Sequence, residues 1–200
     1  MRVHFVTFGC KANQYDTETF RQELQARGAR VVDAPELADA CIVNTCTVTN
    51  AADAAARKAI RKLQRENPGL KIVVAGCSAA LRGDEYDAMD EVFGVVRGHD
   101  AVAVASLIAP EMRAERDEET IGGELLARNE SRTRGWLKVQ DGCDRRCSFC
   151  ATRLARGASR SRPSDDIVAE AAMLAASHRE LVLTGVHIGH YGVDLHEQTD

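Results

Sequence analysis

Three short apolar runs, each followed by a cysteine, constrain the fold of this chain most strongly. They are residues 3–9 before Cys10, residues 41–45 before Cys46, and residues 72–76 before Cys77. Each run is rich in β-branched residues and precedes a helical pattern, which predicts an α/β fold with a parallel sheet. Because the carboxyl ends of parallel strands share one edge of a sheet, we expect the three cysteines to converge there.

The segments between and after these strands carry helix signals. The further elements expected in this first domain are helices over 13–27, from about 50 to 67, and over 100–109, with a short strand over 94–97. Gly28 is placed to end the first helix, and Thr49 or Asn50 to cap the second. Pro110 then closes the domain.

Cys41 lies on the same strand as Cys46 but is not expected to join the other cysteines. Five residues of extended chain separate the two, which amounts to about 16 Å and places them on opposite faces. We therefore expect Cys41 to be a small buried apolar residue.

A second cysteine group lies in one short loop, Cys143-x3-Cys147-x2-Cys150. A [4Fe-4S] cube has four irons and is normally held by four cysteines, so three thiolates leave one iron open. A structural zinc site would need a fourth ligand, usually from a second paired arm, and no such arm follows this loop in the sequence. We therefore expect an open-site iron–sulfur cluster here.

The loop resembles the signature of radical S-adenosylmethionine (SAM) enzymes, in which SAM fills the open iron site. Two sets of three cysteines resemble the methylthiotransferases, a radical SAM subgroup with an auxiliary cluster. The resemblance implies two [4Fe-4S] clusters, one held by Cys10, Cys46 and Cys77, and a second, SAM-binding one held by Cys143, Cys147 and Cys150 beside Phe149. It identifies no catalytic side chain.

The sequence around the cysteines is also similar to the methylthiotransferase family. The similar segments are Gly9-Cys10-Lys11-Ala12-Asn13-Gln14 with Asp16, Val43-Asn44-Thr45-Cys46-Thr47-Val48, Ala75-Gly76-Cys77, and Arg156-Gly157 with Arg160-Ser161-Arg162. Ser78-Ala79-Ala80 departs from the aromatic-Ala-Gln of many members, which bears on the subgroup rather than on the ligands. Residues 183–192 resemble the branch that modifies threonylcarbamoyladenosine in tRNA more than the isopentenyladenosine or ribosomal-protein branches.

The resemblance also implies a reaction. SAM at the Cys143 loop would give a 5′-deoxyadenosyl radical that takes hydrogen from C2 of N6-threonylcarbamoyladenosine at tRNA position 37, beside the anticodon. A methylthio group formed at the auxiliary cluster would then join that carbon. The implied partners are tRNA, SAM, an electron donor and a sulfur donor. The alternatives are isopentenyladenosine or a ribosomal protein as the target, or a truncated, non-catalytic iron–sulfur protein.

The second domain begins with an expected strand over 136–140 that leads into the Cys143 loop. A helix over 165–177, capped by Ser164, and a strand over 181–186 are expected to follow. This pattern resembles the start of a radical SAM domain, a partial TIM-like α/β barrel, within a longer enzyme. The expected organisation is an auxiliary-cluster domain over 1–110, a charged linker or hairpin over 111–134, and an incomplete radical SAM domain over 135–200.

Several polar residues near the cysteines allow more than one interpretation. The segment from 145 to 162 holds six arginines and no acidic residue. It could contact tRNA phosphates, bind the SAM carboxylate or neutralise a cluster, or it could be a solvated basic face. Asn13 and Asn44 could donate hydrogen bonds to cluster sulfur. Alternatively, Asn13 could cap a helix and Asn44 could shape a loop. His187 and His190 are interpreted as ordinary loop residues rather than ligands.

Composition places the chain in an ordinary class. With 200 residues, 44% of them hydrophobic, and a net charge of −4, it fits a plain soluble protein. Seven cysteines without a secretory leader indicate a reducing compartment. No run approaches the roughly 18 apolar residues of a membrane span. We therefore expect a cytoplasmic protein.

Overall fold

A five-stranded parallel sheet forms the centre of the first part of the molecule. The computed structural model describes residues 1–47, 49–111 and 133–195. The strand order is β2-β1-β3-β4-β5. The strands are β1 (Arg2–Thr7), β2 (Arg30–Val31), β3 (Ala40–Thr45), β4 (Lys71–Gly76) and β5 (Gly94–Val95). The predicted α/β class and parallel sheet are confirmed for this part of the chain.

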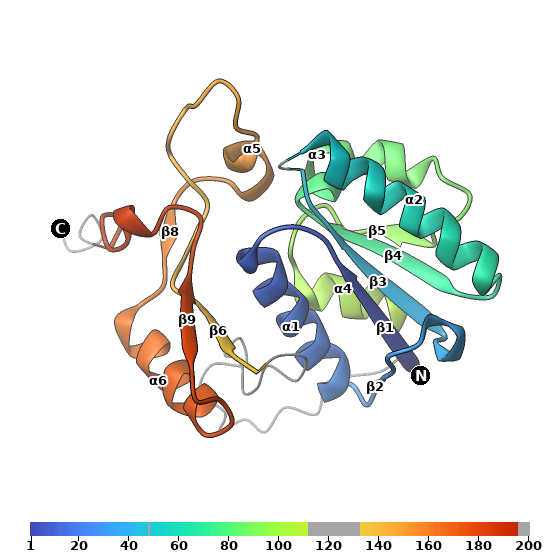
Figure 1. Ribbon diagram of the computed structural model, residues 1–200, viewed down its shortest axis with the longest axis horizontal. Helices are drawn as coiled ribbons and strands as arrows, with labels where there is room; N and C mark the ends of the chain where they lie inside the picture. Colours follow the sequence, from blue (N-terminus) through green and yellow to red (C-terminus); the bar gives the residue numbers. More distant parts are fainter. Residues whose placement is uncertain (48, 112–132, 196–200) are drawn as a thin grey trace.

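Helices cover both faces of this sheet (Figure 1). They are α1 (Lys11–Ala26) and α4 (Ala101–Ile108) on one face, and α2 (Asn50–Glu66) and α3 (Cys77–Asp87) on the other. Side chains alternate along β3, so Ile42 packs with Phe20 and Ile108, while Cys41 packs with Ile60 and Tyr86. Each face therefore has its own apolar core.

The second part of the chain contains one parallel strand pair. β6 (Gly135–Lys138) pairs with β9 (Leu181–Thr184), and α6 (Ser164–Ala175) lies between them in sequence. The smaller elements are β7 (Gln140–Asp141), its antiparallel partner β8 (Arg160–Ser161), α5 (Thr152–Arg156) and two 3-10 turns, η1 (Pro35–Leu37) in the first part and η2 (Ile188–His190) here. One strand–helix–strand unit is compatible with a barrel, which remains a prediction.

Helix α1 joins the two parts, because side chains on two of its sides are buried. Phe20 faces the sheet, whereas Tyr15 packs with Trp136, Leu137 and Leu174 of the second part. Figure 1 shows α1 between the sheet and the β6–β9 pair. The Tyr15 hydroxyl donates to Glu170 on α6 (3.1 Å), so the contact is polar as well as apolar.

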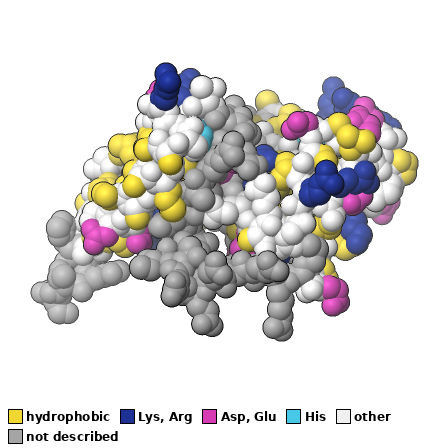
Figure 2. All heavy atoms as spheres, turned by 90° about the horizontal axis from the view of Figure 1, so that it is seen from below, with side chains coloured by type: hydrophobic (Ala, Val, Ile, Leu, Met, Phe, Trp, Pro, Cys, Tyr) yellow, Lys and Arg dark blue, Asp and Glu magenta, His cyan; other side chains and the backbone are white. Residues whose placement is uncertain are grey.

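The two ends of the molecule differ in surface character. Figure 2 shows apolar side chains gathered at the end formed by the second part, and charged side chains over the sheet end. Val168 on α6 and Leu183 on β9 are among the exposed large apolar residues there, with Leu183 58% exposed. This end of the described structure therefore carries exposed apolar side chains. Within the described ranges, no helix is long and apolar enough to cross a membrane.

Most expected elements are present, and the differences have local causes. Thr49 caps α2 through Ala52 N (3.1 Å), and Gly28 follows α1 with a φ of +80°, both as predicted. Ser164 was expected to cap α6 but is its first residue, because Pro163 occupies the cap position without a side-chain hydrogen bond. The predicted linker over 111–134 lies almost entirely outside the described residues.

Loss of the Leu174 side chain should weaken the contact between α1 and the second part. Leu174 is fully buried, so Leu174→Ala should lower the free energy of unfolding by about 2–5 kcal/mol. Met173 is its neighbour on the same helix and 37% exposed, so Met173→Ala should change it by about 0.5 kcal/mol or less. Denaturant unfolding of both variants measures this, and equal losses would contradict the packing described.

Candidate functional site

The three strand-end cysteines meet at one cavity. Cys10 precedes α1, Cys46 directly follows β3, and Cys77 begins α3 after β4. All three line a cavity of about 330 Å³ at the carboxyl edge of the sheet. The predicted convergence is therefore present in the fold, whereas Cys41 is fully buried in the apolar core between the sheet and α2, as expected.

Two glycines allow these cysteines to approach one another. Gly9 and Gly76 have φ values of +99° and +95°, a backbone conformation that residues with a side chain rarely adopt. A Cβ on Gly9 would lie 2.5 Å from Cys46 Sγ, and one on Gly76 would lie 2.5 Å from the Thr45 carbonyl oxygen. A side chain at either position would therefore push two of the cysteine-bearing loops apart.

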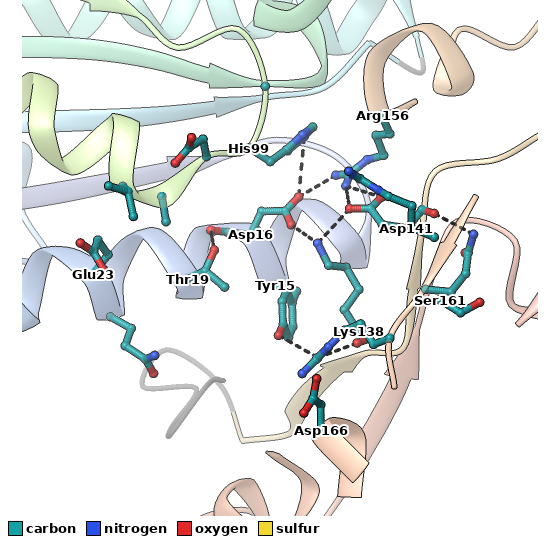
Figure 3. A pocket seen from close by; sticks show the side chains of 18 of the residues that line it. Tyr15, Asp16, Thr19, Glu23, His99, Lys138, Asp141, Arg156, Ser161 and Asp166 are labelled. Carbon is teal, nitrogen blue, oxygen red and sulfur yellow. Dashed lines mark hydrogen bonds and ion pairs between the residues drawn. The ribbon is translucent and has the colours of Figure 1, made fainter. Parts of the chain in front are cut away.

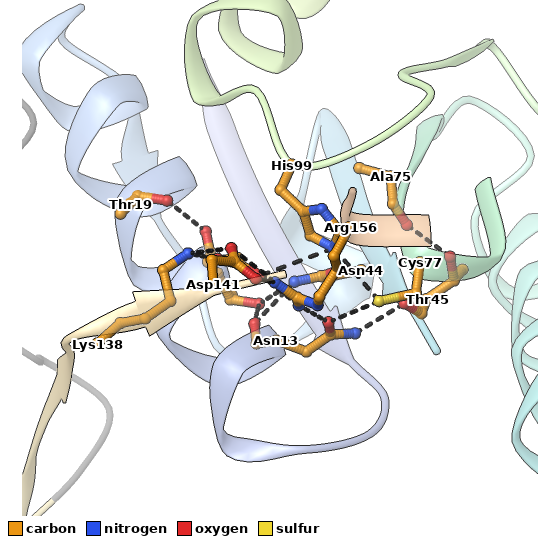
Figure 4. Close-up of polar contacts among 12 residues, drawn as sticks. Asn13, Thr19, Asn44, Thr45, Ala75, Cys77, His99, Lys138, Asp141 and Arg156 are labelled. Atoms are coloured by element: carbon orange, nitrogen blue, oxygen red, sulfur yellow. Dashed lines mark hydrogen bonds and ion pairs between the residues drawn. The ribbon is translucent and has the colours of Figure 1, made fainter. Parts of the chain in front are cut away.

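Asn13 connects all three of these loops. Its Nδ2 donates to the carbonyl oxygens of Phe8 (2.9 Å) and Thr45 (2.7 Å), and its Oδ1 accepts from Cys77 Sγ (3.5 Å; Figure 4). Asn44 Nδ2 in turn donates to the Asn13 carbonyl (2.8 Å) and to Thr17 (3.0 Å). Because both amide groups bind protein atoms, these residues shape the loops rather than cap a helix.

A group of four charges lies beside the cysteines, in which Asp16 and Arg156 are buried and Lys138 and Asp141 are partly buried. Asp16 and Asp141 each pair with both Lys138 and Arg156, at N–O distances of 2.7–2.9 Å (Figure 3). Burial alone would raise the pKa of each carboxyl, but the two cations outweigh burial and hold both pKa values below their usual range. The four charges balance, and they form part of the wall of a larger cavity of about 980 Å³.

His99 and Cys77 lie at the border of this charged group. His99 Nε2 is 3.5 Å from Cys77 Sγ and 3.7 Å from Asp16 Oδ2. Burial lowers the pKa of His99 to about 4, although Asp16 opposes the change, so the imidazole is neutral near pH 7. Burial raises the pKa of the Cys77 thiol to about 11, against the effect of Arg156. Cys77 is thus protonated near neutral pH.

The second cysteine group lies on the surface. Cys147 and Cys150 are exposed and Cys143 is half-buried, all on the loop between β7 and α5. Cys150 Sγ lies 3.1 Å from Thr152 Oγ1, and hydrogen bonds from the side chain and the backbone of Thr152 to the sulfur lower the pKa of the Cys150 thiol. Phe149 is 92% exposed. These groups are accessible to a cofactor.

The Cys143 loop adjoins this cavity through α5, the helix that follows it. Thr152 and Arg156 of α5 and residues 184–186 after β9 line the same 330 Å³ cavity as Cys10, Cys46 and Cys77. Gln140 holds the segment of this wall that follows β9, because its Oε1 accepts from Val186 N (3.0 Å). Its Nε2 donates to the Gly142 carbonyl (2.8 Å), which links that segment to the start of the Cys143 loop. Segments far apart in sequence therefore build one site.

The cysteines suit iron–sulfur clusters by donor type and by space. Three thiols border a cavity in which glycine backbones leave room, which fits a bulky cluster with one open iron. Among residues 1–47, 49–111 and 133–195, no group of three or more His, Cys, Asp or Glu side chains is gathered tightly enough to hold a single metal ion. The cysteines as ligands remain a prediction.

The arginines have at least two different roles. Arg156 is buried in ion pairs, and Arg162 pairs with Glu170 (2.7 Å), so the interpretation of a uniform solvated basic face is wrong for these two. Arg145, Arg146 and Arg160 are exposed. Sequence reasoning did not single out Lys138, Gln140, Asp141 or His99. The sequence did carry a signal for three of them, because Lys138, Gln140 and Asp141 are polar residues directly before the Cys143 loop.

His187 and His190 stack with ring centroids 4.1 Å apart. Arg145 Nη2 lies 3.2 Å from His190 Nε2. This contact ties the loop after β9 to the Cys143 loop, and neither histidine belongs to a metal-binding group in the described ranges. That the two residues are ordinary loop residues rather than ligands stays a prediction.

Comparison with known proteins agrees with this geometry. Residues 2–98 match the family described as "Uncharacterized protein family UPF0004". The chain is 35% identical over 205 residues to "Threonylcarbamoyladenosine tRNA methylthiotransferase MtaB" of Aquifex aeolicus, covering 97% of this chain and 50% of that protein. The corresponding protein of Bacillus subtilis is 36% identical over 203 residues, covering 96% of this chain and 45% of the relative.

A relative with a different printed substrate is also similar. "tRNA-2-methylthio-N(6)-dimethylallyladenosine synthase" of Thermodesulfovibrio yellowstonii is 32% identical over 198 residues, covering 94% of this chain and 46% of that protein. The chain thus spans about half the length of the curated relatives it matches. Along almost its whole length, the chain is therefore similar to proteins named as tRNA methylthiotransferases, and about half of it matches the UPF0004 family.

Proposed function

We propose that this chain is part of a radical SAM methylthiotransferase that adds a methylthio group to C2 of N6-threonylcarbamoyladenosine at tRNA position 37. One observation carries the proposal. Cys10, Cys46 and Cys77 line a cavity whose opposite wall is α5, the helix that directly follows the Cys143 loop. Two cluster sites on either side of one small space suit a reaction in which both must reach the same substrate carbon.

Under this proposal each cysteine group holds one [4Fe-4S] cluster. Cys10, Cys46 and Cys77 hold the auxiliary cluster, and Cys143, Cys147 and Cys150 hold the cluster that binds SAM. When bound, these groups supply a radical from SAM and the sulfur to be transferred. The chain itself provides three thiolates for each cluster, the exposed Phe149 ring beside SAM, and a partly enclosed cavity between the sites.

The proposed nucleoside rests on the relatives and on one local observation. Two relatives at 35–36% identity are named for threonylcarbamoyladenosine, and one at 32% for dimethylallyladenosine. Ser78, at the start of the segment that departs from many family members, is fully buried and hydrogen-bonds to Asp53 and Tyr86. It therefore ties α3 to α2, to which Asp53 belongs. Exposed Arg145, Arg146 and Arg160 are proposed to attract tRNA phosphates.

The anaerobically reconstituted, reduced chain should contain two clusters. We expect about eight irons per chain and an EPR spectrum in which SAM perturbs one of two signals. The physical reason is that each set of three thiolates leaves one iron free, and only one of these sites accepts SAM. About four irons with no response to SAM would contradict the two-cluster assignment.

Removal of one strand-end thiol should remove one cluster only. Cys10→Ala should lower the iron content to about four per chain while the SAM-sensitive signal remains. The matched control is Cys41→Ala, because Cys41 lies on β3 in the apolar core and should leave about eight irons. Iron and sulfide analysis measures both variants. If Cys10→Ala kept the full iron content, Cys10 would not be a ligand.

The nucleoside can be identified directly. Reconstituted chain with SAM, sulfide and a reductant should methylthiolate tRNA that carries threonylcarbamoyladenosine and not tRNA that carries isopentenyladenosine. Mass spectrometry of nucleosides after digestion measures the product. A product from the isopentenyladenosine tRNA alone would assign the chain to that branch, and two clusters without SAM cleavage would favour a non-catalytic iron–sulfur protein.

A further inference from the structure

Arg156 joins three segments that are distant in sequence. Its side chain is only 2% exposed. Nη1 donates to both carboxylate oxygens of Asp141 (2.9 and 3.0 Å), directly before the Cys143 loop. Nη2 donates to Asp16 Oδ2 (2.7 Å) and Asn13 Oδ1 (2.5 Å) on α1. One guanidinium thus connects β7, α5 and the first turns of α1.

The contacts of Arg156 continue through Asn13 to the strand-end cysteines. The Asn13 oxygen that binds Arg156 also accepts from Cys77 Sγ (3.5 Å). The amide nitrogen of Asn13 donates to the carbonyl of Thr45, the residue before Cys46, and to that of Phe8, two residues before Cys10. Displacement of Arg156 would therefore reach all three loops through a single side chain.

The geometry requires arginine rather than a positive charge alone. A guanidinium presents a planar fork of five donors, and Arg156 uses it to reach three partners at once: Nη1 contacts both oxygens of Asp141, and Nη2 donates to Asp16 and Asn13. Lys138 already pairs with both carboxylates, at 2.7 Å from Asp16 and 2.9 Å from Asp141. Lysine at 156 would keep the charge but could not span Asp141, Asp16 and Asn13 together.

We propose that Arg156 is a positioning residue that fixes the Cys143 loop relative to the Cys10, Cys46 and Cys77 loops. The bridge stands on the contacts above, and its consequence for the clusters rests on the proposed function. Arg156 also lines the 330 Å³ cavity beside Cys10, Cys46 and Cys77, so its position affects the space between these cysteines and α5. Its loss leaves each set of three cysteines intact but changes their separation.

Hydrogen exchange of the cluster-free chain tests the bridge itself. In Arg156→Gln, backbone amides of α5 and of residues 8–14 should exchange about tenfold faster than in the unaltered chain. Arg156→Lys should behave in the same way, because the charge without the fork does not restore the bridge. The matched control is Arg153→Gln, on the same helix, for which the described part of the chain gives no ion pair, and it should leave both segments unchanged.

Two results of this exchange experiment would overturn the proposal. If the amides of α5 and residues 8–14 exchanged at the same rate in Arg156→Gln as in Arg153→Gln, the contacts of Arg156 would not position these segments. A uniform rise that includes β4 and α2 in both Arg156 variants would show that Arg156 stabilises the whole fold and does not position these loops.

The cluster-loaded chain provides a second measurement. Arg156→Gln should keep the iron content of the unaltered chain but change the magnetic interaction between the two reduced clusters in EPR, since that interaction depends on their separation. An unchanged interaction would overturn the proposal. If the unaltered chain bound no clusters, the proposed function would fail, whereas the exchange experiment would still decide the role of Arg156.

Discussion

The placement of the two cysteine groups depends on two carboxylates that are matched by two cations, with one of each, Asp16 and Arg156, buried and the others partly buried. Asp16 belongs to α1, whereas Asp141, Lys138 and Arg156 belong to the second part of the chain. Taking such groups out of water costs several kcal/mol per ion, and removal of one partner from a buried pair typically costs about 3–5 kcal/mol. Asp16 therefore has these two partners only when the two parts dock, whereas Asp141 keeps its neighbour Lys138 and gains Arg156 when α5 folds over it.

This requirement links folding to the site. Docking of the second part against α1 places α5 at the mouth of the cavity that Cys10, Cys46 and Cys77 line. Tyr15 and Leu174 supply apolar burial for the same contact, and the ion pairs set its register because their geometry tolerates little sliding. Apolar packing and charge pairing thus act together to bring α5, which follows the Cys143 loop, to the cavity that Cys10, Cys46 and Cys77 line.

The cysteines themselves are in different environments. Cys77 is buried beside the neutral His99, and burial raises its pKa, whereas Cys150 is exposed and hydrogen-bonded to Thr152, which lowers its pKa. Three thiols on a sheet edge are held by glycine-dependent turns, and three on a loop are open to solvent. Such a difference suits the two separate tasks that the proposed function assigns to the clusters.

Much of the first part could be predicted from sequence because its signals are local. The β-branched runs, the Thr49 cap and the position of Gly28 depend on neighbouring residues alone, and they agree with the fold. The prediction that Ser164 caps α6 was wrong, because Pro163 occupies the cap position. The φ angle that the proline ring fixes is compatible with the residue before a helix. The short strand β2 was missed, since two paired residues leave no periodic pattern.

The sequence by itself determined the α/β class of the first part, the convergence of Cys10, Cys46 and Cys77, and the exclusion of Cys41, because strand direction and side-chain alternation follow from local chain geometry. Only the tertiary structure decided that Arg156 is buried, that Asn13 joins three loops, and that Gln140, Asp141 and His99 belong to the site. These roles depend on side chains up to 143 residues apart in sequence, as in the hydrogen bond from Arg156 to Asn13. No local pattern encodes such a contact, since it forms only once both parts have folded and docked.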